Sequence, residues 1–219
     1  MWDMRNLFSL DLVLLSPRDG EWYVCTVAGA PKARGTSRAL PFIAVSKAPS
    51  EALPTLAKSL STKTVGAASK WMTQVGAFSE GTHPADTPIS IAFVAVYADG
   101  VVHDEEGWVR AETAVLPSRQ KAVLKATLAM LKHAVEHEPI AFHALPSTFT
   151  LRELQQVYEL LLERPLHKAS FRRSLQAAQL VEPTKAWRAE GRGRPAQLYK
   201  FAPRRRRGSV RGVRFELAR

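Results

Sequence analysis

The chain has 219 residues, of which 46% are hydrophobic and 23% are charged. This composition is typical of a globular protein with one long domain or two small ones, and no apolar run approaches the roughly 20 residues that cross a bilayer. The apolar stretch Leu7–Leu15 is interrupted by Asp11 and lacks a basic segment and a cleavage site, so we expect no signal peptide. The single cysteine, Cys25, excludes an internal disulfide and a cysteine-based zinc site, and it suits a cytoplasmic protein.

The positive charge is confined to one part of the chain. Residues 1–139 contain 14 Lys and Arg against 14 Asp and Glu, whereas residues 140–219 contain 17 against 6, which accounts for the whole net charge of +11. A neutral part joined to a basic part predicts a sensing or scaffolding domain attached to one that binds a polyanion. The alternative is a solubilising tail, but only Arg204–Arg207 form such a run, and the other thirteen cations lie in a patterned segment.

The N-terminal part predicts strands mixed with helices. Leu10–Leu15 and Glu21–Ala28 flank the polar residues Ser16–Gly20, which indicates a β-hairpin. Cys25 alternates with apolar neighbours in the second strand and is expected in the core. Ile89–Tyr97 is a candidate buried strand, and Ser118 is a candidate cap for a helix that runs to about Glu136. This mixture predicts an α/β or α+β domain.

The helix predicted after Ser118 contains a possible metal motif. His133 and His137, with Glu136 before the second histidine, match the bare HxxEH pattern of inverted zincins. A zinc protease also needs a distal carboxylate ligand and a cleft, and neither is evident. We therefore interpret the helix as a connector between domains, with Leu124, Leu128 and Leu131 buried.

Two helices are predicted near the start of the basic part. Thr150 and Glu153 have the spacing of a capping box, and apolar residues then recur at helical spacing until Pro165. A second helix is expected from about Lys168 to Gln179. Phe171, Leu175 and Ala178 share one face of it, and the opposite face carries Ala169, Arg172, Arg173 and Gln176. Arg can bond guanine and Gln can bond adenine, as on a recognition helix, although a charged face is usually only solvated.

A basic hairpin is predicted to follow, with Pro183 ending the helical region. Lys185–Arg188 and Gln197–Phe201 are strand candidates, and the glycine-rich loop between them carries Arg192 and Arg194. Two helices followed by a basic hairpin form the layout of a winged helix, which reads the major groove with its second helix. The tetrad Arg192–Pro195 also matches the core of an AT-hook, a reader of the minor groove, although four residues are a weak match.

These segments resemble the Nudix-related transcriptional regulators of the NrtR family. The C-terminal resemblance is carried by Phe149–Tyr158, Arg164–Leu166, Phe171–Arg173, Leu180–Pro183 and Gly193–Ala196. Pro139–Phe142 fits the family's domain junction, and Gln74–Phe78 with Ile89–Phe93 resembles its Nudix core. The resemblance weakens between about residues 29 and 70. It implies an α/β fold class, a Nudix-like α/β/α sandwich followed by a C-terminal winged helix.

The weak stretch is where a Nudix hydrolase keeps its catalytic helix, whose glutamates hold Mg²⁺. The expected frame begins at Arg38–Pro41, but Phe42 and Ile43 replace its two glycines. Leu56–Thr64, where the metal-binding carboxylates should lie, contains no acid, and Glu51 is the nearest one. We therefore expect the fold without hydrolysis, no metal site and no catalytic Mg²⁺.

The predicted organisation has four parts. Residues 1–115 form a degenerate Nudix-like sensing domain, 116–139 a connecting helix, 140–203 a winged helix and 204–219 a basic tail. The residues expected to contact DNA are Lys168, Ala169, Ser170, Arg172, Arg173, Gln176, Arg192, Arg194, Arg204 and Arg205. Those expected to contact an effector are Arg34, Arg38 and Phe42.

The predicted function is sequence-specific transcription regulation, as a repressor or an activator, by a homodimer on a palindromic operator. The resemblance implies a nucleotide-like effector such as ADP-ribose or an NAD metabolite, and control of NAD or nucleotide metabolism genes. Two alternatives remain. One is a residual Nudix pyrophosphohydrolase acting on ADP-ribose-like substrates, and the other is a nonspecific nucleic-acid-binding protein that needs no Arg and Gln face.

Overall fold

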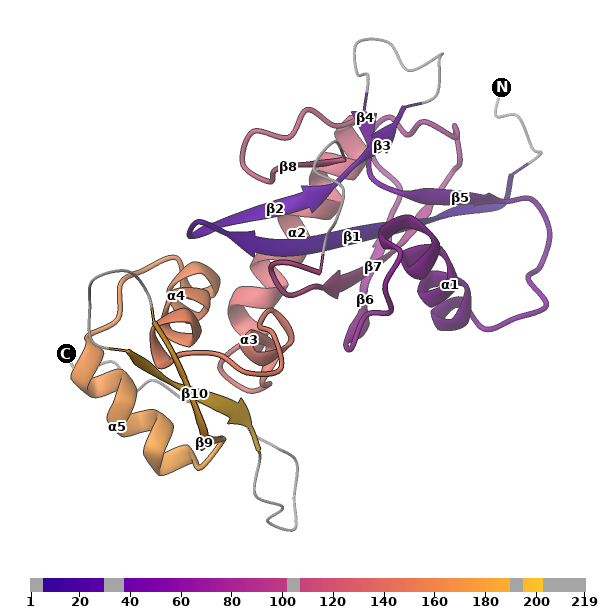
Figure 1. The fold of residues 1–219 in the computed structure, drawn as a ribbon. Helices are drawn as coiled ribbons and strands as arrows, with labels where there is room; N and C mark the ends of the chain where they lie inside the picture. The colour runs from indigo at the N-terminus through magenta and orange to yellow at the C-terminus, as the bar shows by residue number, and fades with distance from the viewer. Residues whose placement is uncertain (1–5, 30–37, 102–106, 190–194, 203–219) are drawn as a thin grey trace. The chain divides into compact units, whose positions relative to one another are not determined.

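The computed structural model describes residues 6–29, 38–101, 107–189 and 195–202, and it divides into two units, Met1–Met130 and Leu131–Arg219 (Figure 1). No helix in these four ranges is long and apolar enough to cross a membrane. Five residues expected to bind DNA or an effector lie outside the described residues: Arg34, Arg192, Arg194, Arg204 and Arg205.

Strand β1 (Phe8–Arg18) is the central strand of the first unit, and its residues are buried except at the two ends. It pairs with the antiparallel strand β2 (Glu21–Cys25) across Asp19 and Gly20, whose φ values are 49° and 79°. Two left-handed residues in a two-residue loop match the twist of the flanking strands. The predicted turn Ser16–Gly20 is therefore too long, because Asp-Gly alone reverses the chain and β1 continues to Arg18.

The second predicted strand is interrupted after Cys25. Val27–Ala28 form the separate strand β3, which pairs with β4 (Arg38–Ala39). The main sheet has the order β6-β7-β1-β2-β8, and β5 also pairs with β1. The bounds of the remaining strands are Phe42–Val45 for β5, Met72–Phe78 for β6, Ser90–Val96 for β7 and Trp108–Arg110 for β8. The predicted strand Ile89–Tyr97 is β7, which runs parallel to β1.

Two helices lie against opposite faces of this sheet. Helix α1 (Leu53–Val65) packs Ala57 into a core with Leu10, Leu12 and Leu14 of β1. Asp11 points to the other face, because neighbouring residues of a strand alternate, and there it accepts a hydrogen bond from Gln120 of α2 (Ser118–Ala134). The predicted α/β/α sandwich is thus confirmed, and α2 corresponds to the helix expected from Ser118.

After the end of α2, the described residues of the second unit form three helices and a hairpin: α3 (Ile140–His143), α4 (Leu151–Leu162), α5 (Lys168–Ala178), β9 (Val181–Arg188) and β10 (Ala196–Phe201). Its interior is aromatic: Phe142 stacks on Phe201 with 4.3 Å between ring centroids, and Tyr158 meets Phe171 edge-on at 5.6 Å. This order of elements is the predicted winged helix.

One prediction in this unit is wrong. Pro183 does not end the helical region, because α5 stops at Gln179, which has left-handed φ and ψ of 50° and 42°. Strand β9 begins at Val181, and Pro183 lies within it opposite Tyr199. Proline fits there because the pairing of the two strands shifts between Gln197 and Tyr199, and such irregular positions tolerate a residue without an N–H.

Candidate nucleic-acid interface

The start of α4 has the predicted capping box. The Thr150 hydroxyl accepts a hydrogen bond from the Glu153 N–H at 3.2 Å, and Glu153 Oε2 accepts one from the Thr150 N–H at 2.6 Å. Two backbone N–H groups without helical partners are thereby satisfied. Glu153 has a second role, since its Oε1 accepts a hydrogen bond from Arg188 of β9 at 2.6 Å.

The turn from α4 to α5 is fixed by side chains of α4. Glu163 ends α4 in a left-handed conformation with φ of 54°. Glu159 Oε1 accepts hydrogen bonds from the Leu166 N–H at 2.8 Å and from the Gln155 side chain at 2.9 Å. Gln155 also donates to the Leu166 carbonyl at 3.0 Å. Both backbone polar groups of Leu166, two residues before α5, are thus hydrogen-bonded to side chains of α4.

Helix α5 separates an apolar face from a cationic one. Phe171 and Leu175 are each only 1% exposed, and Phe171 packs on Tyr158 of α4. The structure places all six predicted α5 residues on the exposed surface of the helix: Lys168, Ala169, Ser170, Arg172, Arg173 and Gln176. Within the described part of the chain, no carboxylate forms an ion pair with the three cations among them. They remain available to an anionic partner.

The hairpin β9–β10 is attached to the start of α4 at two points. The backbones of Phe149 and Tyr199 exchange two hydrogen bonds, of 2.9 and 2.7 Å, and Arg188 pairs with Glu153. Arg188 stands opposite Ala196 in the last strand pair before the connecting loop. The hairpin is therefore anchored close to the loop whose sequence carries Arg192 and Arg194.

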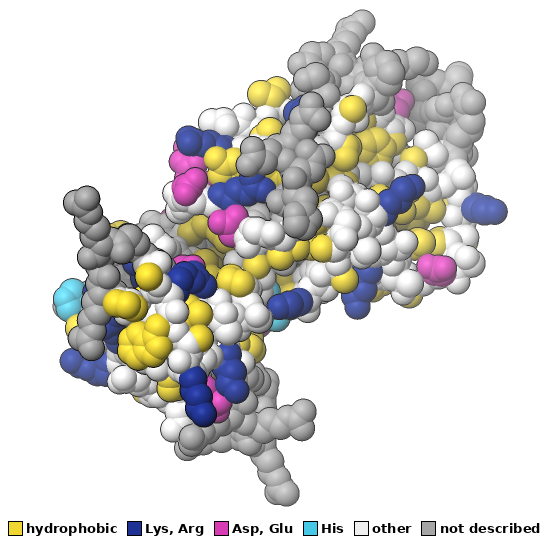
Figure 2. Space-filling view, viewed as in Figure 1, with side chains coloured by type: hydrophobic (Ala, Val, Ile, Leu, Met, Phe, Trp, Pro, Cys, Tyr) yellow, Lys and Arg dark blue, Asp and Glu magenta, His cyan; other side chains and the backbone are white. Residues whose placement is uncertain are grey.

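A groove of about 370 Å³ separates α5 from the hairpin. Its walls include Arg172 and Gln176 of α5 and Glu182, Pro183 and Tyr199 of the hairpin. Lys and Arg side chains are spread over the surface of this unit in Figure 2. The polar face of α5 thus continues into a concave surface bounded by the hairpin.

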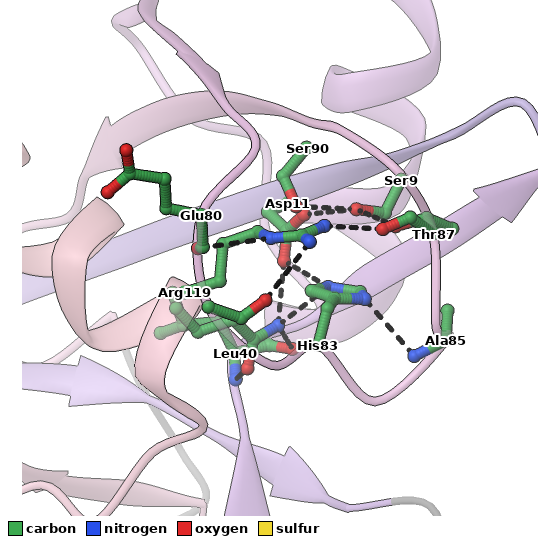
Figure 3. A network of polar contacts seen from close by, with 11 residues as sticks. Ser9, Asp11, Leu40, Glu80, His83, Ala85, Thr87, Ser90 and Arg119 are labelled. Carbon is green, nitrogen blue, oxygen red and sulfur yellow. Dashed lines mark hydrogen bonds and ion pairs between the residues drawn. The ribbon is translucent and has the colours of Figure 1, made fainter. Parts of the chain in front are cut away.

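The first unit buries a polar network between β1 and α2 (Figure 3). Asp11 accepts hydrogen bonds from Ser9 at 2.7 Å, His83 Nε2 at 2.9 Å and Gln120 at 2.7 Å. The Ala85 N–H donates to His83 Nδ1, which leaves the His83 proton on Nε2, where Asp11 accepts it. Burial raises the pKa of Asp11, but the hydrogen bonds from His83, Gln120 and Ser9 outweigh it, so the pKa is lowered from its ordinary value.

Arg119 joins the same network to the loop between β6 and β7. Its guanidinium donates to the carbonyls of Thr87 at 2.6 Å, Ser79 at 3.0 Å and Gly81 at 3.1 Å, and the residue is 2% exposed. The Ser118 hydroxyl accepts a hydrogen bond from the Thr82 N–H at 2.7 Å. Because Arg119 and Ser118 are hydrogen-bonded to the backbone of this loop, they hold it in a fixed shape.

Helix α1 covers the segment where the resemblance predicts a Nudix catalytic helix, but it lacks the acidic residues of such a helix. It contains no Asp or Glu and carries Lys58 and Lys63, while Glu51 is exposed before its start. Mg²⁺ is held by several oxygen ligands. Among the described residues, no three His, Cys, Asp or Glu side chains form a group that could hold a metal ion. These residues do not fit the Mg²⁺ of a Nudix hydrolase.

Two predicted effector residues lie in the described part, and each has partners within the protein. Arg38 Nε donates to the Thr26 hydroxyl at 2.6 Å, and the Phe42 ring meets His83 edge-on at 4.9 Å between centroids. Both side chains are half-buried. Their contact with an effector stays a prediction.

Sequence reasoning missed the buried network and the Glu153–Arg188 pair. Asp11 was visible as a charge in an apolar strand, which is a signal for a buried polar site. No sequence signal joins Glu153 to Arg188, because the two residues are 35 positions apart.

The chain is similar to known proteins in both sequence and fold. Residues 141–201 match the family model of the NrtR DNA-binding winged helix domain. The chain is 26% identical over 206 residues to the ADPR responsive transcriptional repressor NtrR of Acinetobacter baylyi, covering 90% of this chain and 82% of that protein. The crystal structure of Shewanella oneidensis NrtR complexed with a 27mer DNA matches with a TM-score of 0.78 and 22% identity, covering 94% of this chain and 98% of the other.

A Nudix protein also matches the fold. The MutT/nudix family protein from Enterococcus faecalis aligns with a TM-score of 0.63 and 16% identity, over 90% of this chain and 88% of that chain. The protein thus has the architecture of a Nudix-like domain joined to a winged helix. The resemblance to the NrtR regulators is confirmed, and residues 141–201 are an NrtR-type DNA-binding winged helix domain.

Proposed function

We propose that this protein is a ligand-responsive transcriptional regulator that binds duplex DNA through α5 and the hairpin. The observation that carries the proposal is the division of α5: Phe171 and Leu175 are buried, whereas Arg172, Arg173 and Gln176 are exposed on a domain of the DNA-binding winged helix type. Such a helix can enter the major groove while its apolar face stays packed on α4. Arginine and glutamine there can discriminate guanine and adenine.

The experiment begins by isolating the genomic fragments that the full-length protein retains, so that a specific site is available. Binding of that site and of a scrambled duplex is then measured at one salt concentration for R172A, R173A and Q176A. Loss of a bidentate base contact typically costs about 1–3 kcal/mol, so the ratio of specific to nonspecific affinity should fall. Lys125→Ala removes an exposed cation from α2 and serves as the control. An unchanged ratio in all three α5 variants would refute this reading of the helix.

We further propose that the regulator acts as a repressor and that ADP-ribose is its effector. The support is the similarity to a repressor whose name states that it responds to ADPR, together with the Nudix-like fold of the first unit. The test is DNA binding by the full-length protein with ADP-ribose present, against AMP and ribose 5-phosphate as controls. No change in affinity with ADP-ribose would reject this effector and leave DNA binding by α5 intact.

We infer that the first unit senses this ligand without hydrolysing it. The support is the absence of acidic residues from α1 and the lysines in their place. ADP-ribose incubated with the protein and Mg²⁺ or Mn²⁺ should remain intact in chromatography. Turnover that disappears in E51Q would establish the alternative function, a residual pyrophosphohydrolase.

We also propose that the protein binds as a homodimer on a palindromic operator, since one recognition helix covers only one half-site. Sedimentation of the protein–DNA complex should give two chains for each duplex. The protected region should contain two inverted half-sites. A complex of one chain with one asymmetric site would contradict the proposal.

A further inference from the structure

Trp187 is the most exposed large hydrophobic residue among the described residues of the second unit, with 56% of its surface accessible. It lies in β9, one residue before Arg188 and opposite Gln197 of β10. Tryptophan is usually buried to a large extent, and exposed aromatic residues are enriched where proteins bind their partners. The exposure of Trp187 therefore indicates a surface that binds a partner.

The backbone around Trp187 is held in place. Arg188 is bonded to Glu153 of α4 at 2.6 Å, and because neighbouring strand residues face opposite sides, the Trp187 ring points away from α4. The Gln197 side chain donates to the Thr184 carbonyl at 3.2 Å, and the Thr184 hydroxyl donates to the Leu198 carbonyl at 2.9 Å. These bonds join the two strands beside the tryptophan, so its exposure follows from an ordered hairpin.

The charge around the tryptophan selects the kind of partner. The described residues of the hairpin, 181–189 and 195–201, contain three Lys and Arg against one acidic residue, Glu182. Lys185, two residues before Trp187, is exposed. A second copy of the chain would bring the same positive charge to this surface. Duplex DNA brings the opposite charge and also offers the apolar deoxyribose walls of its minor groove.

We propose that Trp187 is a DNA-contact residue of the hairpin, packing its ring against deoxyribose groups at the minor groove beside the site read by α5. This inference rests on the proposed DNA-binding function and adds a contact that releases no counterion. Minor-groove proteins commonly use such apolar contacts next to cationic ones. Cationic contacts to phosphates weaken with salt, whereas the contribution of Trp187 should be nearly independent of it.

The first test uses the fluorescence of the full-length protein. Binding of the duplex retained from the genome should quench the emission of the wild type, and most of this change should be absent in W187F. The control is W22F, which removes a half-buried tryptophan of β2 and should retain the quenching. Quenching that persists in W187F would overturn the proposal.

The second test measures affinity across a series of salt concentrations. W187A should bind the duplex roughly tenfold more weakly, as expected for a lost aromatic contact, with the wild-type salt slope. K185A should instead reduce the slope by about one. Wild-type affinity in W187A would reject the contact. Dissociation of W187A into smaller species in sedimentation would also reject it, because Trp187 would then lie between subunits. Neither outcome would contradict the proposed DNA-binding function, because the wild type would still bind DNA and the α5 variants would still lose specific binding.

Discussion

The two units of this protein stabilise their interiors by different means. Between β1 and α2, the first unit buries the Asp11 carboxylate, which is hydrogen-bonded to the His83 imidazole and to Gln120, and the Arg119 guanidinium, which donates to the loop between β6 and β7. The second unit packs aromatic rings between α3, α4, α5 and β10. Buried polar groups require partners in fixed directions, whereas apolar packing depends on volume.

The two kinds of interior support different features of the molecule, a loop in the first unit and an exposed helix face in the second. In the first unit the polar network defines the shape of one loop, because Arg119 donates to four of its carbonyls. In the second unit the aromatic interior supports α5 and needs none of its polar side chains. The cations of α5 therefore stay on the surface. Mutations should thus show distinct signatures in the two units, dependent on pH in one and on side-chain volume in the other.

The largest effect is expected from F171A, which leaves a cavity beside Tyr158 and Leu175. A buried Phe→Ala change typically costs about 3–5 kcal/mol, and α5 should lose its place on α4. Urea unfolding followed by circular dichroism gives the free energy of unfolding, and the affinity for the selected duplex should fall with it. R172A, on the exposed face of the same helix, should leave the free energy unchanged. Equal stability of the two variants would show that α5 is not held by its apolar face.

The second prediction concerns the polar interior. R119M keeps much of the side-chain length but leaves four carbonyls of the loop without their charged donor, those of Ser79, Glu80, Gly81 and Thr87. Each buried group without a partner costs about 1–3 kcal/mol, but water that enters the opened loop can bond some of these groups. We therefore expect the free energy of unfolding to fall by roughly 2–4 kcal/mol. Limited proteolysis should cut the loop between β6 and β7 faster than in the wild type. K121M, an exposed change two residues further along α2, is the control, and equal behaviour of the pair would argue against the role of Arg119.

The sequence predicted the second unit more accurately than the first, for a physical reason. The capping box, the apolar stripe of α5 and its exposed cations depend on spacings of three, four and seven residues, which a local pattern contains. The bonds of Asp11 to His83 and Gln120 join residues 72 and 109 positions apart. No local pattern predicts such pairs. The start of β9 was also misplaced, since Pro183 was expected to end the helical region, whereas it lies inside the strand, where the shift in strand pairing accommodates it.

The third prediction tests the pH dependence of the first unit. The pKa of Asp11 is below 3.8 in the folded protein, so its ionised form stabilises the fold above pH 3.8, and this contribution is lost as the pH falls through the lower folded pKa. D11N should therefore be less stable than the wild type at neutral pH, by about 1–3 kcal/mol. The difference should shrink on acidification below pH 3.8. E51Q, an exposed change, should show no such convergence, and a constant gap between D11N and the wild type would exclude the ionised carboxylate as its cause.

The smallest effect on stability, and the most informative one for binding, is expected from E153Q. Glutamine can still accept the Thr150 N–H at the helix start, so the change removes chiefly the charge paired with Arg188. The two side chains are 30% and 38% exposed, and a pair screened to this extent contributes about 0.5 kcal/mol or less. E153A also removes the cap and should cost about 1 kcal/mol more.

Binding should respond more than stability does, because Arg188 anchors the hairpin at the last strand pair before its loop. Removing one acidic residue raises the affinity for any duplex, so the informative quantity is the ratio of specific to nonspecific affinity. E21Q provides the control for net charge, since it removes the same charge from the exposed Glu21–Arg110 pair of the first unit and leaves the anchor at α4 intact. The ratio should fall in E153Q and stay at the wild-type value in E21Q. If the two variants change the ratio equally, the effect is one of net charge, and the hairpin owes its position to the Phe149–Tyr199 backbone bonds alone.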